Sequence, residues 1–129
     1  MILLDTCAFI WDALAPRQLS ADARAAIERN AGELLVCDIT FWEVAMLVRK
    51  GRLEIDCTPA AMIDLALQAR NHAIQDITPE IAELSTNLAG ELGDDPADRL
   101  IAASSILGNT PVVTADRRMR NSNLLETIW

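Results

Sequence analysis

The sequence predicts an α/β fold built around a mainly parallel β-sheet. Short apolar runs of strand length recur along the chain, stretches of helical character separate them, and proline or glycine marks most of the boundaries. Parallel strands that neighbour one another need right-handed crossover connections, so their carboxyl ends lie along one edge of the sheet. In open sheets of this kind the ligand crevice lies at that edge. Residues that directly follow the strands are therefore the first candidates for a functional site.

The first half of the chain carries signals for two strands and three helices. Each apolar run is short enough for a strand buried on both faces, and each ends at an acid, Asp5 or Asp38. Ser20 is a preferred N-cap residue, and Gly51 stands where a glycine commonly ends a helix. The expected strands are residues 2–4 and 34–37, and the expected helices are residues 7–14, 21–30 and 40–50.

The second half of the chain is punctuated by three pairs of an N-cap residue and a proline. The pairs Thr58-Pro59, Thr78-Pro79 and Asp95-Pro96 each predict the start of a helix, because proline is well tolerated at the first helical position. Gly108 is expected to end the third of these helices. The expected helices are residues 60–69, 81–92 and 96–107, and the expected strands are residues 73–77, 111–114 and 124–128.

Length and composition indicate a single globular domain over residues 1–129. Hydrophobic residues make up 51% of the chain and charged residues 23%, which is typical of a folded protein. The formal net charge is −8, so the chain as a whole repels nucleic acid and anionic lipid. If the protein acts on a phosphodiester, positive charge must be supplied locally.

Several classes of site and location are excluded or disfavoured by residue counts. One histidine, His72, is too few for most zinc sites and for most Ser/His or Cys/His dyads. The three cysteines show no paired spacing, which favours reduced thiols in the cytoplasm. No apolar run approaches the ~18 residues of a membrane span, and the first residues do not resemble a signal peptide. We therefore expect a cytoplasmic protein with no membrane partner.

Four acids are expected to share the crevice at the strand ends. Asp5 ends the first strand and Asp116 follows the strand at residues 111–114. Glu43 and Asp98 lie in the first turns of the predicted helices that begin near residues 40 and 96. Four carboxylates in one crevice repel one another, and their natural partner is a hard divalent cation with oxygen ligands, Mg²⁺ or Mn²⁺.

Each of these acids also has a purely local interpretation. Thr40 and Glu43 fit the capping-box pattern, in which the glutamate bonds back to the helix start. Asp98 suits the positive end of a helix dipole, and Asp5 suits a turn or an N-cap. Asp116, which precedes two arginines, suits an exposed loop. These local interpretations are independent of one another, whereas a shared site accounts for all four acids with one fold.

The chain resembles PIN-domain proteins of the VapC type, the toxin half of bacterial toxin–antitoxin pairs. Four segments in the order typical of that family carry the resemblance: LLDTCAFIW at residues 3–11, TFWEVAMLVRKGRL at 40–53, DPADRLIAASS at 95–105 and VVTADRRM at 112–119. Their span covers nearly the whole chain. Matched residue by residue, the acidic quartet of the family falls on Asp5, Glu43, Asp98 and Asp116.

The resemblance implies a flavodoxin-like three-layer α/β/α sandwich and a metal-dependent endoribonuclease activity. It also implies that the quartet binds Mg²⁺ or Mn²⁺, that the protein is a homodimer, and that it has a cognate VapB-type antitoxin. Two positions depart from close relatives, which often carry histidine where this chain has Cys7 and Gly93. Neither belongs to the quartet, so these departures bear on substrate preference more than on metal binding.

Two threonines and two arginines are further candidates. The hydroxyls of Thr6 and Thr114 are close in sequence to the acids and are candidates to orient them, although either threonine also suits a strand end. Arg117 and Arg118 belong to the densest basic cluster and are candidates to bind RNA phosphates. The alternative for these arginines is a solvated loop that offsets the neighbouring acids.

Two other functions remain to be weighed against the ribonuclease. A response-regulator receiver domain has a similar length and an acidic Mg²⁺ pocket, but it requires a lysine at the end of a late strand. The only lysine here is Lys50, in the predicted helix that carries Glu43. A PIN-fold binding module without activity is disfavoured by the complete quartet, although the sequence leaves it open.

Overall fold

The computed structural model describes residues 1–129 and contains one five-stranded sheet. The strand order is β3-β2-β1-β4-β5, and every neighbouring pair is parallel. The strands are β1 (Ile2–Leu4), β2 (Leu34–Cys37), β3 (Ala73–Gln75), β4 (Val112–Val113) and β5 (Thr127–Ile128). The first strand of the chain is thus the central strand of the sheet, and its carboxyl end lies beside that of β4.

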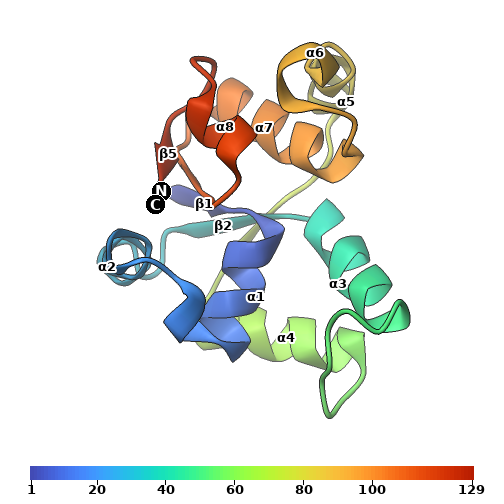
Figure 1. Ribbon diagram of the computed structural model, residues 1–129. Coiled ribbons are helices and arrows are strands. Elements are labelled where there is room, and N and C mark those ends of the chain that lie inside the picture. Colours follow the sequence, from blue (N-terminus) through green and yellow to red (C-terminus); the bar gives the residue numbers. More distant parts are fainter.

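Helices cover both faces of this sheet, which gives three layers (Figure 1). On one side lie α1 (Thr6–Leu14), α2 (Ala21–Arg29), α3 (Ile39–Arg49) and α4 (Pro59–Arg70). On the other side lie α5 (Pro79–Ser85), α6 (Ala89–Leu92), α7 (Pro96–Gly108) and α8 (Arg117–Asn121). The predicted α/β/α sandwich is confirmed. None of the helices combines the length and the apolar character that a membrane crossing requires.

Two apolar clusters sit on the two sides of the sheet, and alternate residues of the central strands feed them. In β1, Leu4 packs into the cluster with α1 and α4, whereas Leu3 packs into the cluster with α7. In β4, Val113 and Val112 divide in the same way. All four side chains are buried. This is why β1 and β4 are short runs without polar residues, as expected for strands covered on both faces.

The predicted N-caps are confirmed by hydrogen bonds. The side chains of Ser20, Thr58 and Thr78 accept from the backbone N–H three residues later, and Asp95 accepts from Ala97. Each bond satisfies one of the free N–H groups at a helix start. The end of α7 differs from the prediction: Gly108 is its last residue, and Asn109 ends the helix in a left-handed conformation with φ 47°.

Two helical segments differ from the sequence prediction. The single helix expected over residues 81–92 is interrupted after Ser85 and continues as α6 from Ala89. The hydroxyls of Ser85 and Thr86 donate to the carbonyls of Ala82 and Glu83, so these side chains compete with the backbone at the break. The short helix α8 was not expected, and the last strand is limited to Thr127–Ile128.

The central strand generates a prediction about stability. Leu4 is fully buried, so replacing it by alanine should leave a cavity and lower the free energy of unfolding by about 2–5 kcal/mol. The control is Leu65→Ala in α4, because Leu65 is 64% exposed and its loss should change stability by no more than about 0.5 kcal/mol. Urea unfolding followed by circular dichroism measures both; equal effects would contradict this account of the core.

Candidate functional site

Asp5 and Asp116 are positioned by two neighbouring strands. The N–H of Asp5 donates to the carbonyl of Val113 at 3.2 Å, which fixes the residue at the end of β1 beside the end of β4. Its carboxylate caps α1, since Oδ1 accepts from the N–H of Ala8 at 2.8 Å. Asp5 is 6% exposed, so this carboxylate is enclosed by the fold. The predicted N-cap role is therefore real, and it coexists with a place at the strand edge.

Asp116 is held by a turn and by a short helix. Its N–H donates to Thr114 Oγ1 at 3.0 Å, and its Oδ1 accepts from the N–H of Met119 at 3.0 Å. The residue is therefore the N-cap of α8 and not an exposed loop charge, as one interpretation of the sequence had it. In both Asp5 and Asp116 the N-cap bond engages Oδ1, which leaves Oδ2 outside the cap.

Glu43 reaches across to α1 instead of back to its own helix start. Helix α3 begins before Thr40, and its N-cap residue Asp38 makes no side-chain cap. The carboxylate of Glu43 accepts a short hydrogen bond from Thr6 Oγ1. The hydroxyls of Thr6 and Thr40 are also hydrogen-bonded to each other, at 3.1 Å. The capping-box interpretation of Thr40 and Glu43 is therefore wrong, and Glu43 belongs to the crevice.

Asp98 lies in the first turn of α7, where the other three acids act on it. Burial raises its pKa to about 7, and the charges of Asp95, Asp116, Glu43 and Asp5 add to that rise. The structure thus brings together the acids that the sequence predicted would share a crevice. Asp98 is the one whose carboxyl group the others perturb most visibly.

The two threonines sit on the acids as predicted. Burial raises the pKa of Asp5 to about 6, and the charge of Asp116 adds to this, while hydrogen bonds from the Thr114 side chain and the Ala8 N–H oppose it. Burial likewise raises the pKa of Glu43, and the hydrogen bond from Thr6 opposes the rise. Both hydroxyls therefore orient a carboxylate and favour its ionised form.

Two residues at this site were not assigned to it from the sequence. The sequence predicts Asp95 only as a helix cap, yet its charge is the largest charge effect on both Asp98 and Glu43. The spacing of three residues between Asp95 and Asp98 at a helix start was the available signal, because such residues share a helix face. Cys7, although exposed, is near enough to the acids for their charges to act on it: partial desolvation and then the charges of all four predicted acids raise its pKa to about 12. Its thiol stays protonated, which disfavours a nucleophilic role.

The acidic side chains of this site suit a metal ion by the chemistry of their oxygen atoms but not by their present positions. No group of three or more His, Cys, Asp or Glu side chains is arranged closely enough here to ligate one ion. The donors nevertheless suit a hard cation, because they are carboxylates whose charges act together on Asp98, and the two ion pairs of the molecule lie elsewhere. Because like charges repel, these side chains stay apart in the absence of an ion. Binding of an ion therefore requires them to move closer together.

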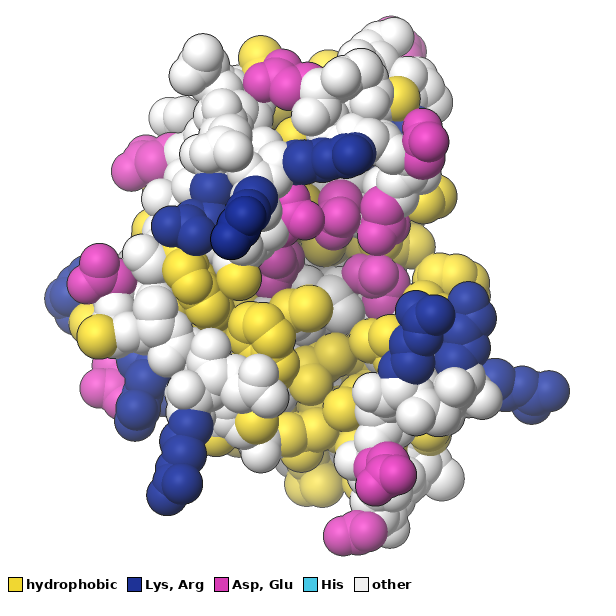
Figure 2. Space-filling view, in the orientation of Figure 1, with side chains coloured by type: hydrophobic (Ala, Val, Ile, Leu, Met, Phe, Trp, Pro, Cys, Tyr) yellow, Lys and Arg dark blue, Asp and Glu magenta, His cyan; other side chains and the backbone are white.

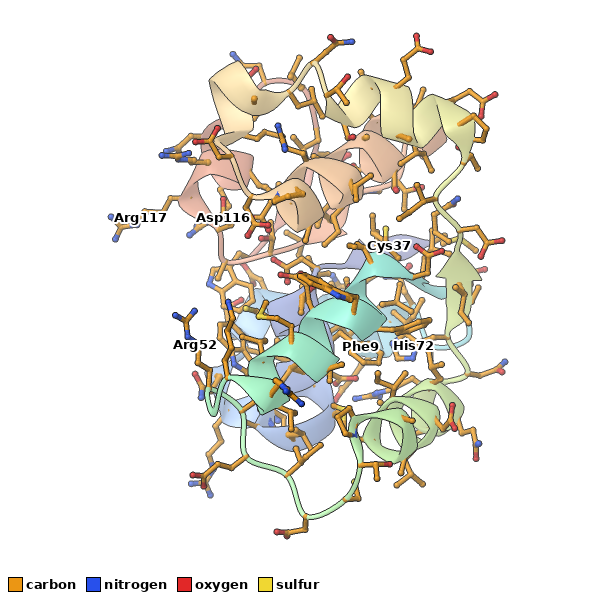
Figure 3. All side chains as sticks on the ribbon, turned by 90° about the vertical axis from the view of Figure 1, so that its right-hand side faces the viewer. Phe9, Cys37, Arg52, His72, Asp116 and Arg117 are labelled. Atoms are coloured by element: carbon orange, nitrogen blue, oxygen red, sulfur yellow. The ribbon has the colours of Figure 1, made fainter.

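Basic side chains flank the acids without pairing with them. Figure 2 shows acidic side chains gathered near the middle of one face, with basic side chains on either side of them. Arg117 and Arg118 are exposed residues of α8. In Figure 3, Arg117 projects from the edge at which Asp116 lies, and Arg52 lies at the same edge. The face therefore combines an acidic centre with a cationic border.

The raised pKa values predict how stability depends on pH in the metal-free protein. Between about pH 4 and pH 7 the folded protein holds protons on Asp5 and Asp98 that the unfolded chain has lost. The free energy of unfolding should therefore fall as pH rises through this window, and the loss should persist above it. Asp98→Asn should flatten this decline and raise the melting temperature near pH 8, as measured by thermal denaturation in EDTA.

The control for this experiment is Asp64→Asn, which removes the same charge from an exposed position on α4. It should leave the pH dependence unchanged. A melting temperature several degrees lower in Asp98→Asn near pH 8 would show instead that Asp98 serves mainly to stabilise the start of α7 through the helix dipole.

Comparisons with known proteins agree with this fold. The family model described as PIN domain matches residues 2–123. The protein named Ribonuclease VapC22 of Mycobacterium tuberculosis (strain ATCC 25618 / H37Rv) is 36% identical over 121 residues, which are 93% of this chain and 90% of that protein.

Solved structures share the fold at lower identity. The structure of VapBC2 from Rickettsia felis bound to a DNA fragment from their promoter has a chain with TM-score 0.73 and 20% identity, over 98% of this chain and 97% of that one. A toxin–antitoxin complex from Klebsiella pneumoniae gives TM-score 0.68 and 22% identity, over 95% and 93% of the two chains. With a family match over nearly its whole length, this chain belongs to the PIN domain family.

Proposed function

We propose that this protein is a metal-dependent endoribonuclease that hydrolyses RNA phosphodiester bonds and acts as the toxin of a toxin–antitoxin pair. The observation that carries the proposal is the meeting of carboxylates from four separate segments around Asp98. The identity with a protein named as a ribonuclease supports the choice of RNA as substrate. A binding module without activity would have no need to keep four mutually repelling acids together.

The residues that would hold Mg²⁺ or Mn²⁺ are Asp5, Glu43, Asp98 and Asp116. Carboxylate oxygens are the ligands these ions prefer, and the repulsion that raises the pKa of Asp98 is relieved when a cation is bound. When bound by these residues, such an ion would lower the pKa of the attacking water and would offset negative charge on the reacting phosphate. The oxygens of Asp5 and Asp116 that lie outside the N-cap bonds are the ones free for this purpose.

The other side chains of the crevice position these ligands. Thr6 donates to Glu43 and so fixes which way that carboxylate faces. The Thr114 side chain bonds to Asp5 while its oxygen accepts from the N–H of Asp116, so one residue links two acids. Glu43 is the group proposed to orient the attacking water or to accept its proton. In-line attack by water would leave a 5′-phosphate and a 3′-hydroxyl.

The toxin role implies a VapB-type antitoxin, and we propose a surface for it. A groove of about 320 Å³ runs between α1 and α4, and eight of its eleven lining residues are hydrophobic. Leu14 and Leu65 on its border are among the exposed large apolar side chains. An apolar helix face of the antitoxin is the occupant that suits such a groove. The similar solved structures are toxin–antitoxin complexes, which supports this partner, and a homodimer in the cytoplasm is part of the same proposal.

The first test of the activity is Asp5→Asn. Asparagine retains an oxygen that can cap α1, so the fold should persist, while the loss of one carboxylate should lower the rate of RNA cleavage by about 100-fold or more. Cleavage is measured on a structured RNA with Mg²⁺ by gel electrophoresis. Asp64→Asn is the matched control and should cleave at the wild-type rate; wild-type cleavage by Asp5→Asn would refute the proposed site.

The second test concerns the metal. EDTA should stop cleavage, and excess Mg²⁺ or Mn²⁺ should restore it. Because an ion that binds only the folded protein stabilises it, Mg²⁺ or Mn²⁺ should also raise the melting temperature of the wild type. This rise should be much smaller in Asp98→Asn. Activity that survives thorough chelation, or equal stabilisation of both proteins, would remove the metal from the proposal.

A further inference from the structure

The side chain of Arg118 lies directly across the backbone of Gly93. A Cβ atom built on Gly93 would stand 1.7 Å from Nη1 of Arg118 and 3.0 Å from its Cζ, so a side chain at position 93 would force this guanidinium to move. Gly93 also has φ +80°, a conformation that residues with a side chain rarely adopt. Glycine at this position therefore permits both the turn and the placement of the guanidinium group.

Arg118 is carried by a short helix that is fixed at both ends. Asp116 caps the start of α8, and the side chain of Met119 is fully buried in the core on that side of the sheet. At the other end, Ser122 Oγ donates to Glu91 Oε1 at 2.7 Å and ties the helix to α6. A platform held in this way limits where the guanidinium can go, which lowers the entropy that its ligand must overcome.

The charge of Arg118 has no partner within the molecule. The side-chain ion pair joins Arg70 and Asp12, and the other ion pair joins the N-terminus and Glu33. None of the side-chain hydrogen bonds involves Arg118. Acids are nevertheless near it, because Asp116 is two residues earlier in the sequence and Asp95 is two residues after Gly93, over which the guanidinium lies. The molecule thus holds a free guanidinium at the border of its acidic crevice, in a chain whose net charge is −8.

A polyanion that enters this crevice needs such a cation. The carboxylates repel phosphates, and a bound divalent ion compensates only for the charge in its immediate vicinity. The guanidinium offers two parallel N–H donors that match two oxygens of one phosphate. A side chain at position 93 would occupy the place of the Arg118 guanidinium. Glycine at this position therefore leaves room for the guanidinium to contact a phosphate.

We propose that Gly93 and Arg118 form one phosphate clamp, in which the guanidinium lying over Gly93 binds a backbone phosphate of single-stranded RNA beside the scissile bond. This assignment rests on the proposed ribonuclease function and names the two residues that align the substrate strand. Arg118 is a positioning residue, since it contacts a phosphate that does not react. The clamp acts on the sugar–phosphate backbone, so it is independent of base sequence.

The test measures RNA binding without cleavage. A fluorescein-labelled single-stranded RNA of about 20 nucleotides is titrated with protein in EDTA, and fluorescence anisotropy gives Kd at several salt concentrations. In Arg118→Ala we expect Kd to rise about five- to tenfold, and the slope of log K against log salt to fall by about 0.7, the value for one lost contact to a single strand. The salt slope is a readout that a merely structural role of Arg118 would leave unchanged.

Two further variants examine the pairing with Gly93. Gly93→Ala should displace the guanidinium and weaken binding about as much as Arg118→Ala, and the double variant should bind no more weakly than either single one. Arg118→Lys keeps the charge without the two-donor geometry, so its Kd should be intermediate while the salt slope stays near that of the wild type. Circular dichroism checks that each variant is folded. If Gly93→Ala does not fold, Arg118→Ala and Arg118→Lys alone are sufficient to test the phosphate contact.

The control for net charge is Arg29→Ala at the end of α2, an exposed arginine that should leave both Kd and the salt slope unchanged. Wild-type Kd and slope in Arg118→Ala would overturn the clamp, and additive losses in the double variant would overturn the role of Gly93. Either result leaves the ribonuclease proposal standing if the wild type cleaves RNA with Mg²⁺. A wild type that neither binds nor cleaves RNA would overturn both.

Discussion

Repulsion among carboxylates at one edge of the sheet is the constraint around which this molecule is organised. Each acid reaches the crevice from a different segment, and Asp98 experiences the charges of Asp95, Asp116, Glu43 and Asp5 at once. A fold gains nothing in stability from such an arrangement, so the rest of the structure has to hold it in place. It does so through the parallel strands, whose carboxyl ends meet at one edge, and through helices that begin there.

The hydrogen bonds around the acids serve structure and site together. Asp5 and Asp116 cap the helices that follow their strands, so replacing either by a residue without a side-chain oxygen would weaken a helix start. Thr6 and Thr114 also serve both purposes. Each belongs to a segment at the strand edge, and the side chain of each forms a hydrogen bond to an acid of the site. The N-cap role that the sequence offers for Asp5 is therefore compatible with a place in the crevice, and Asp116 combines an unexpected N-cap role with such a place.

The layered fold follows from features that a sequence displays openly. Apolar runs such as residues 34–37, and pairs such as Thr58-Pro59, are local signals, and they were sufficient for the order of most elements. The break after Ser85 and the short helix α8 depend on side-chain hydrogen bonds and on the burial of Met119, which no local pattern reveals. At the site, Asp5 and Asp116 could be chosen from strand ends, and Glu43 and Asp98 from the first turns of predicted helices. The charge effect of Asp95 on Asp98 and the position of Arg118 over Gly93 depend on the tertiary structure, so the sequence could not predict them.

The position of β1 in the sheet has a consequence for the order in which the crevice is assembled. β1 lies in the centre of the sheet, and its pairing with β4 joins Leu4 to Val113, which is far along the chain. Contacts that span so much of a sequence form late and slowly. A nascent or truncated chain that ends before β4 carries Asp5, Glu43 and Asp98 but lacks the strand that delivers Asp116. Such a fragment is expected to lack a complete crevice, because the fourth acid comes into place only with β4.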